Sequence, residues 1–194
     1  MGSGSAKSRV FVAVLAEEEW RRRLGVVKKE LSSCISSDSV RWVSQEKIHL
    51  TLVFLGYVES DDFPLLNACL SEICEGTNRL RVRLLGLGVF PNWSRPRVLW
   101  AGIDGDLDAL ADLQSQLFRV CTGFGEDRTS GTFRPHVTIA RFIRRLPPAW
   151  CDRIRRLEPS FEGSEVAVRA IVLMKSELFD GGSRYLELGR FALQ

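Results

Sequence analysis

Short runs of apolar, β-branched residues recur along the chain and are separated by charged or glycine-containing stretches. Runs of about four to eight such residues bounded by turn residues predict β-strands. The expected strands are Arg9–Leu15, Val40–Val43, Ile48–Leu55, Leu80–Val89, Val98–Ile103, His136–Phe142, Val166–Met174 and Tyr185–Phe191.

Other segments place apolar residues three or four positions apart, which is the period of an amphipathic helix. The expected helices are Glu17–Leu31, Asp61–Cys74, Leu107–Val120 and Pro148–Leu157. Several strands follow one another without an intervening helix, which indicates antiparallel pairing. The pattern therefore predicts the α+β class.

A chain of 194 residues is long enough to bury one sizeable core without disulfides. We expect a single domain over residues 9–194 and exclude the Gly/Ser-rich residues 1–8 as an expression tag or a disordered start. No apolar run is long enough to span a membrane, and the start lacks the apolar region of a signal peptide. The 5 cysteines form no Cys-x-x-Cys pair, which favours free thiols, no zinc site and a cytoplasmic protein.

The charge distribution adds a candidate partner. Net charge is only +3, but Arg supplies most of the 27 basic residues, and Arg binds phosphate through two parallel hydrogen bonds. Arg is concentrated in residues 79–97, which contain no acidic residue, and in residues 128–156, where Asp152 is the one acid. A solvated surface would explain either run alone. Two such runs in one small domain favour an anionic partner such as RNA.

The only two histidines in the sequence share a local motif. His49-Leu50-Thr51 and His136-Val137-Thr138 each place Thr two positions after His. Because Thr is rare in this sequence, both matches would coincide by chance roughly once in a thousand. On a strand, residues two apart point to the same face, so each motif presents an imidazole beside a hydroxyl.

Two such strands facing each other would form a site for phosphodiester chemistry. Two imidazoles supply a general acid and a general base near neutral pH. Two hydroxyls can donate hydrogen bonds to phosphate oxygens while their charge redistributes. A single strand histidine would more often be a structural residue, but the duplicated motif favours the catalytic interpretation.

The sequence resembles the two-histidine phosphoesterases, and within them the RNA 2′,3′-cyclic phosphodiesterases of the LigT type, once called 2′-5′ RNA ligases. The double His-x-Thr motif carries the resemblance to the superfamily, and the flanking segments carry the resemblance to this branch. The matching segments span Arg9 to Leu193 in the same order and are 9–14, 41–56, 97–114, 133–141 and 176–193.

This resemblance implies a bilobal α+β fold in which two pseudosymmetric lobes with antiparallel sheets flank a central groove. It implies hydrolysis of RNA 2′,3′-cyclic phosphate ends to 2′-phosphates without a metal or other cofactor. An accompanying ATP-independent 2′-5′ RNA ligation would use a 5′-hydroxyl in place of water. By analogy His49 is the proton donor and His136 the proton acceptor, while Thr51 and Thr138 hold the phosphate. The implied substrates are tRNA fragments or oligonucleotides with cyclic phosphate ends, or small cyclic nucleotides.

Four further residues are weighed as parts of the site. Arg134 and Arg97 are candidate phosphate ligands, with a surface ion pair as the alternative for each. Phe11 is a candidate base-stacking residue, although core packing is the commoner use of a strand phenylalanine. Arg141 lies five positions after His136 and is expected to face away from the site unless a β-bulge intervenes.

Competing functions remain at this point. The sequence has no phosphate-binding G-x-x-x-x-G-K-S/T loop, no dinucleotide fingerprint and no ligand spacing for a metal. The same four groups could act on 2′-5′ oligonucleotides or another cyclic phosphodiester, and a bell-shaped pH–rate profile would fit either enzyme. An RNA-binding protein with little turnover would instead show salt-dependent binding without catalysis. We expect a monomer, because no apolar stripe is left uncovered.

Overall fold

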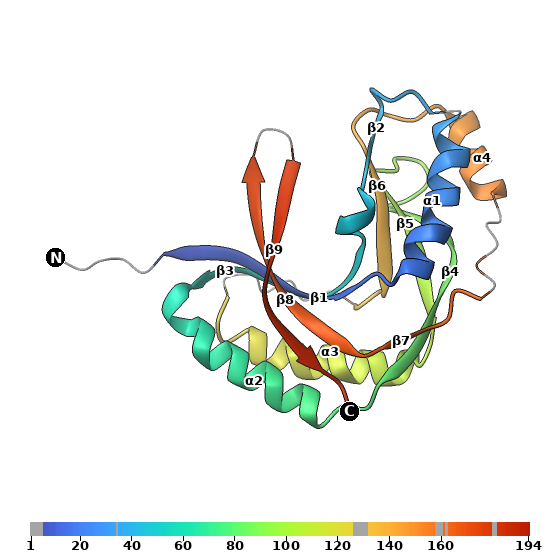
Figure 1. The fold of residues 1–194 in the computed structure, drawn as a ribbon. Helices are drawn as coiled ribbons and strands as arrows, with labels where there is room; N and C mark the ends of the chain where they lie inside the picture. Colours follow the sequence, from blue (N-terminus) through green and yellow to red (C-terminus); the bar gives the residue numbers. More distant parts are fainter. Residues whose placement is uncertain (1–5, 34, 126–131, 158–160, 162, 180–181) are drawn as a thin grey trace.

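The structure is a computed structural model that describes residues 6–33, 35–125, 132–157, 161, 163–179 and 182–194. Figure 1 shows the order of its elements. The helices are α1 (Glu18–Ser32), α2 (Phe63–Glu75), α3 (Leu107–Cys121) and α4 (Pro148–Arg156), with short 3₁₀ helices at Gln45–Lys47 and Ser60–Asp62. The strands are β1 (Lys7–Leu15), β2 (Val40–Trp42), β3 (His49–Glu59), β4 (Leu80–Phe90), β5 (Val98–Gly105), β6 (His136–Phe142), β7 (Val166–Val168), β8 (Ala170–Phe179) and β9 (Gly182–Ala192).

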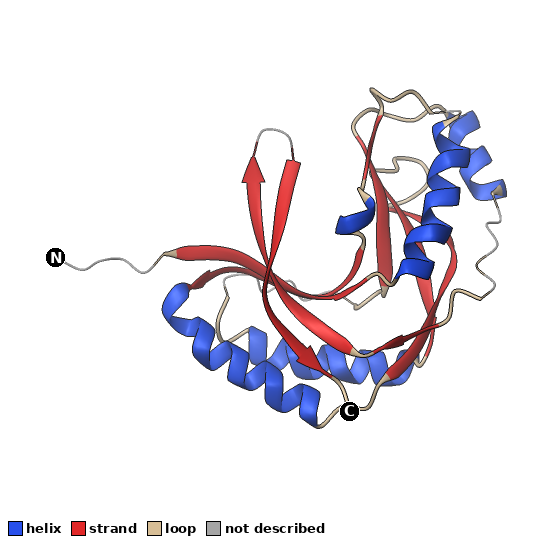
Figure 2. Cartoon of the chain, viewed as in Figure 1, coloured by secondary structure: helices blue, strands red, loops and turns tan. Residues whose placement is uncertain are grey.

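The strands form one continuous sheet in the order β7-β4-β5-β6-β3-β1-β8-β9, and β2 adds to β6. The pairings between described residues are antiparallel. The sheet curls so that the β8–β9 hairpin stands opposite β6, while the helices lie on its outside (Figures 1 and 2). This arrangement confirms the α+β class and the antiparallel pairing predicted from the sequence, although the strands of both halves belong to one sheet.

The two strands that carry the His-x-Thr motifs meet at the middle of the sheet. β3 and β6 share a single register pair, Leu50 with Val137. β1, β8 and β9 continue the sheet on the β3 side, with α2 and α3 beneath them, whereas β4, β5 and β7 continue it on the β6 side, beside α1 and α4 (Figure 1). The narrow junction lets the sheet bend sharply between the two motifs.

Some expected boundaries differ from those observed. β1 begins at Lys7, inside the excluded segment 1–8, and the domain bounds 9–194 otherwise stay a prediction. The expected strand Val166–Met174 is two strands, because β7 pairs with β4 at one end of the sheet and β8 pairs with β1 on the other side. A single apolar run of sequence thus supplies one strand to each half of the sheet. Its composition does not indicate where the first strand ends and the second begins. The glycine-containing segments 123–132 and 180–182, which the sequence predicts to be a loop and a turn, fall largely outside the described residues.

The core lies between the sheet and the outer helices. The apolar face of α1 is buried as its spacing predicts, through Trp20, Leu24, Val27 and Leu31. The Trp20 Nε1–H donates to the Ser164 carbonyl oxygen at 2.8 Å, and the Ser164 hydroxyl accepts the Leu84 N–H at 3.1 Å. These bonds satisfy polar groups that would be costly to bury alone and fix α1 against β4. In the described part of the chain, no helix combines the length and apolarity needed to cross a bilayer.

Candidate active site

The two motif strands direct both histidines and both threonines into one groove. Along β3 and along β6 the His and Thr side chains are half-buried, while the intervening Leu50 and Val137 are fully buried on the opposite face. The four motif residues line a single cavity of about 470 Å³ between the halves of the sheet. The structure thus brings together His49, Thr51, His136 and Thr138. In the sequence, the second His-x-Thr motif lies 87 residues after the first.

Strand register places the imidazole of one motif beside the hydroxyl of the other. Because Leu50 pairs with Val137 in antiparallel register, the flanking positions set His49 beside Thr138 and Thr51 beside His136. The two histidines therefore occupy opposite corners of a four-residue arrangement. A phosphate at its centre could contact an imidazole from each side.

Each imidazole is held by the same backbone contact. The Nδ1 of His49 lies 2.7 Å from the Lys47 carbonyl oxygen, and the Nδ1 of His136 lies 2.7 Å from the Arg134 carbonyl oxygen. A carbonyl can only accept, so Nδ1 carries the proton in each ring. Nε2 is then the nitrogen that exchanges a proton with substrate, as acceptor in the neutral ring and as donor in the imidazolium.

Aromatic rings pack around both histidines. The His49 ring lies 5.0 Å from Phe11 and 5.5 Å from Tyr185 between centroids. These contacts restrict the rotation of the imidazole and leave its Nδ1 hydrogen bond in place. The same arrangement recurs in the other half of the sheet.

The His136 ring lies 4.9 Å from Phe90 and 6.1 Å from Trp100 between centroids. Trp100 on β5 is the register partner of Gly88 on β4, and its indole ring lies over that glycine. A Cβ atom at residue 88 would overlap the ring. Glycine at this position is therefore required for the aromatic support of His136.

Burial sets the protonation of both imidazoles. Burial lowers the pKa of His49 below the ordinary 6.5, the hydrogen bond to Lys47 opposes this, and the nearby His136 and Arg141 lower it further. Burial likewise lowers the pKa of His136, with the bond to the Arg134 carbonyl opposing and Arg141 adding to the decrease. Both rings are therefore mainly neutral at pH 7 in the free protein, and a bound anion would favour the imidazolium form.

Arg141 faces the site, and the expectation that it faces away is wrong. The pairing of β6 with β5 shifts between Leu99 and Trp100, so that Ile139 is an extra residue on β6. This β-bulge turns two consecutive side chains, Ile139 and Ala140, into the core and returns Arg141 to the face of His136. Arg141 lines the histidine cavity and has no ion-pair partner among the described residues.

The same bulge occurs in β3. The pairing of β3 with β1 shifts where Leu52 is the extra residue, and Leu52 and Val53 are both buried. Phe54, five positions after His49, therefore returns to the site face, lines the cavity and is 49% exposed. The doubled apolar residue after each Thr is the sequence signal that could have predicted both bulges.

The remaining candidate residues are placed differently. Phe11 lines the histidine cavity, but it is only 3% exposed and packs against His49 and Tyr185. Arg134 is exposed and lines an adjoining cavity that also includes Phe54 and His136.

Arg97 lies outside the histidine cavity, in a separate pocket at the ends of β5 and β6. Sequence reasoning overlooked Arg9 and Tyr185, which come from β1 and β9 and line the histidine cavity. Neither residue lies near a His-x-Thr motif in the sequence, so only the sheet order reveals them.

The threonine hydroxyls are available to a ligand. Neither Thr51 nor Thr138 has a side-chain hydrogen bond within the described ranges, and both line the cavity. Across the same described ranges, no three His, Cys, Asp or Glu side chains cluster closely enough to hold a metal ion. The site thus combines two oriented imidazoles, two hydroxyls without a hydrogen bond among the described residues, and the guanidinium groups of Arg9 and Arg141.

Comparison with known proteins supplies the family. The sequence matches the profile described as the 2′-5′ RNA ligase superfamily over residues 12–178. The chain belongs to this superfamily. A superfamily member from Archaeoglobus fulgidus, named RNA 2′,3′-cyclic phosphodiesterase, is 32% identical over 94% of this chain and 99% of its own length. A protein of the same name from Aquifex aeolicus is 31% identical over 95% of this chain and 97% of its own.

Solved structures share the fold of this chain. The crystal structure of TT0787 of Thermus thermophilus superposes with a TM-score of 0.80 at 27% identity, covering 95% of this chain and 97% of that one. The apo structure of E. coli LigT superposes with a TM-score of 0.77 at 24% identity, covering 97% and 99%. The curled sheet therefore matches LigT-like two-histidine phosphoesterase structures, as the sequence resemblance implied.

Proposed function

We propose that the protein is an RNA 2′,3′-cyclic phosphodiesterase that converts cyclic phosphate ends to 2′-phosphates without a metal ion. One observation carries the proposal: two histidines with Nδ1 held by backbone carbonyls face one cavity together with two unpartnered threonine hydroxyls. Relatives covering almost the whole chain bear the name of this activity, which supports the choice of substrate.

The reaction needs one proton acceptor and one proton donor on opposite sides of the phosphorus atom. His136 Nε2 takes a proton from water as the water oxygen bonds to phosphorus. His49 Nε2 gives a proton to the 3′-oxygen as the phosphorus–O3′ bond breaks, which leaves a 2′-phosphate and a 3′-hydroxyl. The opposite corners that the register gives to the two histidines suit this division of roles.

The other polar groups act on the phosphate itself. Thr51 and Thr138 donate hydrogen bonds to its non-bridging oxygens, and Arg141 neutralises their charge. The bound phosphate in turn favours the imidazolium form of His49, which offsets the effect of burial on its pKa and readies it as the donor. Phe11 positions His49 by packing rather than by touching substrate.

The expected partners follow from this chemistry. RNA with a 2′,3′-cyclic phosphate end, or a small cyclic nucleotide, is the substrate, and a 5′-hydroxyl in place of water would give the ATP-independent 2′-5′ ligation. The monomeric state and the cytoplasmic location expected from the sequence stay predictions. Gel filtration with light scattering would test the first.

The decisive experiment incubates the protein, with excess EDTA, with a short RNA that ends in a 2′,3′-cyclic phosphate. We expect a 2′-phosphate product, and loss of turnover in His49→Ala and His136→Ala. Exposed Arg119 on α3 lies outside the histidine cavity, so Arg119→Gln serves as the matched control and should retain activity. No turnover by the wild type would overturn the substrate assignment, and turnover that EDTA abolishes would overturn metal independence.

A further inference from the structure

A second basic cavity lies beside the active site. It has a volume of about 530 Å³, sits where β5 begins and β6 ends, and is lined by Arg95, Arg97, Arg144 and Arg145. We propose that this arginine pocket binds the phosphodiester backbone of the RNA strand that precedes the reacting end. The proposal rests on the proposed function and extends it from the cyclic phosphate to the length of RNA that the protein holds.

The charges in the arginine pocket are largely uncompensated. Arg144 pairs with Asp38 at 2.9 Å. Arg95, Arg97 and Arg145 have no ion pair or side-chain hydrogen bond within the described residues. Concentrating like charges in a concave surface without acids is unfavourable for the free protein and attracts anions.

Several arginines elsewhere on the molecule are compensated within their own elements or by the neighbouring strand. On α1, Arg22 pairs with Glu19, and on β4, Arg83 pairs with Asp104. On β9, Arg190 pairs with Glu187. Lack of an ion pair is therefore not a property of every arginine in this Arg-rich chain, and the arginine pocket gathers three arginines that lack one into a single concave surface.

The arginine pocket adjoins the histidine cavity through the two strands they share. Val98 and Arg141 are register partners that line the histidine cavity, and the next residues outward, Arg97 and Phe142, line the arginine pocket. Since a strand advances about 3.3 Å per residue and its successive side chains point to opposite faces, the two cavities approach each other around the rim formed by the start of β5 and the end of β6. An RNA strand whose end lies at the histidines would cross this rim to reach the arginine pocket.

Backbone hydrogen bonds fix the walls of the arginine pocket. The Arg97 N–H donates to the Phe90 carbonyl at 2.7 Å, and the Phe142 N–H donates to the Arg97 carbonyl at 2.9 Å. The Ile143 N–H donates to the Ser39 carbonyl at 2.9 Å, which ties the segment carrying Arg144 and Arg145 to the start of β2. The guanidinium groups thus extend from a preformed frame, which limits the entropy lost on binding.

Polynucleotide phosphate is the anion that fits these features. Guanidinium groups bind phosphate oxygens through paired hydrogen bonds, and several arginines in one pocket suit a strand with one charge per nucleotide. Contacts to the backbone alone fix position without reading base identity. The arginine pocket should therefore lower KM for longer substrates and leave the chemical step unchanged.

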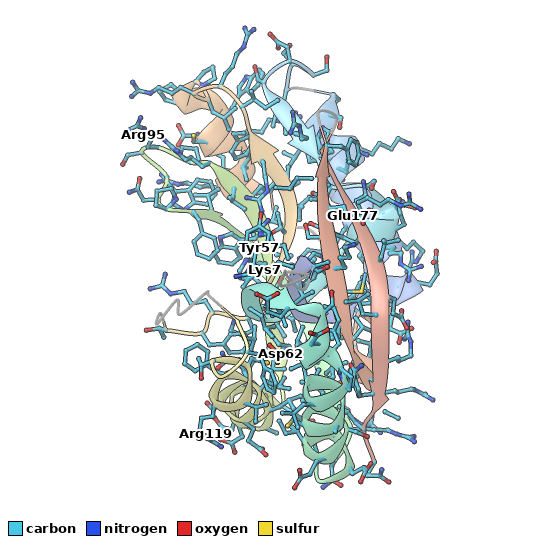
Figure 3. All side chains as sticks on the ribbon, turned by 90° about the vertical axis from the view of Figure 1, so that its left-hand side faces the viewer. Lys7, Tyr57, Asp62, Arg95, Arg119 and Glu177 are labelled. Atoms are coloured by element: carbon cyan, nitrogen blue, oxygen red, sulfur yellow. The ribbon has the colours of Figure 1, made fainter. Side chains whose placement is uncertain are left out.

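The test compares a 2′,3′-cyclic mononucleotide with an RNA octamer that ends in the same cyclic phosphate. In the double variant Arg95→Gln/Arg145→Gln, we expect KM for the octamer to rise about tenfold or more, with kcat unchanged and the mononucleotide unaffected. For single-stranded RNA, log affinity decreases as log salt concentration increases. The slope of this decrease should become shallower by about 0.7 for each phosphate group that the variant no longer binds. Arg119→Gln removes one arginine charge at the opposite end of the molecule from Arg95 (Figure 3) and should leave KM unchanged for both substrates.

Two outcomes would overturn the proposal. One is an equal change in KM for the octamer and the mononucleotide, and the other is no change for either. An octamer whose upstream phosphates are replaced by neutral methylphosphonates should bind wild type and double variant alike, which separates backbone recognition from a general effect of charge.

Failure of the proposed function can be told apart from failure of this inference. If no substrate is turned over, fluorescence anisotropy of the labelled octamer measures binding alone. Weaker binding by the double variant than by wild type or Arg119→Gln would support the arginine pocket without catalysis. Equal binding by all three proteins would overturn it.

Discussion

The two motif strands, β3 and β6, are built to one plan and differ in the chemistry of the last side chain that each directs into the groove. In each, His and Thr face the groove, two apolar residues after Thr enter the core through a bulge, and the side chain five positions after His returns to the groove. That side chain is Phe54 in β3 and Arg141 in β6. The shared backbone arrangement orients the two imidazoles in the same way. The residue five positions after each His makes their surroundings unequal.

This difference teaches how a duplicated motif supports an asymmetric reaction. Hydrolysis needs an acid on one side and a base on the other, but the backbone contact through Nδ1 is the same for both histidines. At this position one strand places a guanidinium in the groove and the other places an aromatic ring there. We infer that charge placement, rather than imidazole orientation, separates the roles.

The largest expected effect comes from removing either imidazole. His49→Ala and His136→Ala should each lower kcat by about 10²- to 10⁴-fold, the usual contribution of general acid–base catalysis. Steady-state kinetics measures this, and thermal unfolding checks that both variants fold.

A substrate with a p-nitrophenolate leaving group would distinguish the two histidines. This group departs without a proton, so His49→Ala should lose much less activity on it than His136→Ala does. Equal losses would contradict the assignment of His49 as donor.

The second comparison targets the position five residues after each His, which is Arg141 in β6 and Phe54 in β3. Arg141→Gln should lower kcat/KM by about 10- to 100-fold, because a charge-assisted hydrogen bond to phosphate is removed. Since Arg141 lowers the pKa of both histidines, its removal should raise those pKa values and move the acid limb of the kcat/KM profile to higher pH.

Two controls sharpen this result. Arg141→Lys keeps the positive charge and should leave the acid limb near its wild-type position despite lower activity. Phe54→Leu changes the equivalent position of β3 without a charge and should not move the limb. A limb unmoved in Arg141→Gln would show that the guanidinium does not act on the imidazoles.

A smaller effect on kcat is expected from removing either threonine hydroxyl of the site. Thr51→Val and Thr138→Val are nearly isosteric and should each lower kcat by about 3- to 10-fold, the value of one neutral hydrogen bond. Similar losses would show that the two strands hold the phosphate equally. Activity above wild type in either variant would argue against phosphate contact by that hydroxyl.

The smallest effect is on stability and follows from burial of the imidazoles. Both folded-state pKa values lie below the ordinary 6.5. As pH falls below 6.5, the unfolded chain therefore binds protons that the folded chain does not. The free energy of unfolding should then decrease by at most about 1.4 kcal/mol per pH unit for each histidine.

Urea unfolding at about pH 7.5 and about pH 5.5 measures this loss. A double variant with Ala at His49 and His136 should show a smaller decrease than the wild type between the two pH values. A decrease of the same size in both proteins would assign the pH dependence to carboxylates instead.

Local sequence patterns predicted the helices and strands well, because each pattern depends on residues that lie close together in the chain. Strand alternation placed both motifs on strands, and helical spacing identified the buried face of α1. Arg141 was misplaced because strict alternation assumes an unbroken ladder, whereas a bulge shifts every later side chain to the other face. Arg97 was a candidate phosphate ligand of the site, and the sheet places it in a separate pocket.

The sequence by itself determined the chemical groups, their pairing within each strand and the α+β class, because these depend on neighbours a few residues apart. Only the tertiary structure decided that β3 and β6 meet at one register pair, which sets each histidine beside the threonine of the other motif. It also decided that β1 and β9 complete the cavity with Arg9 and Tyr185. Such long-range neighbours depend on how the whole sheet is ordered and curled, and no short segment of the chain carries that information.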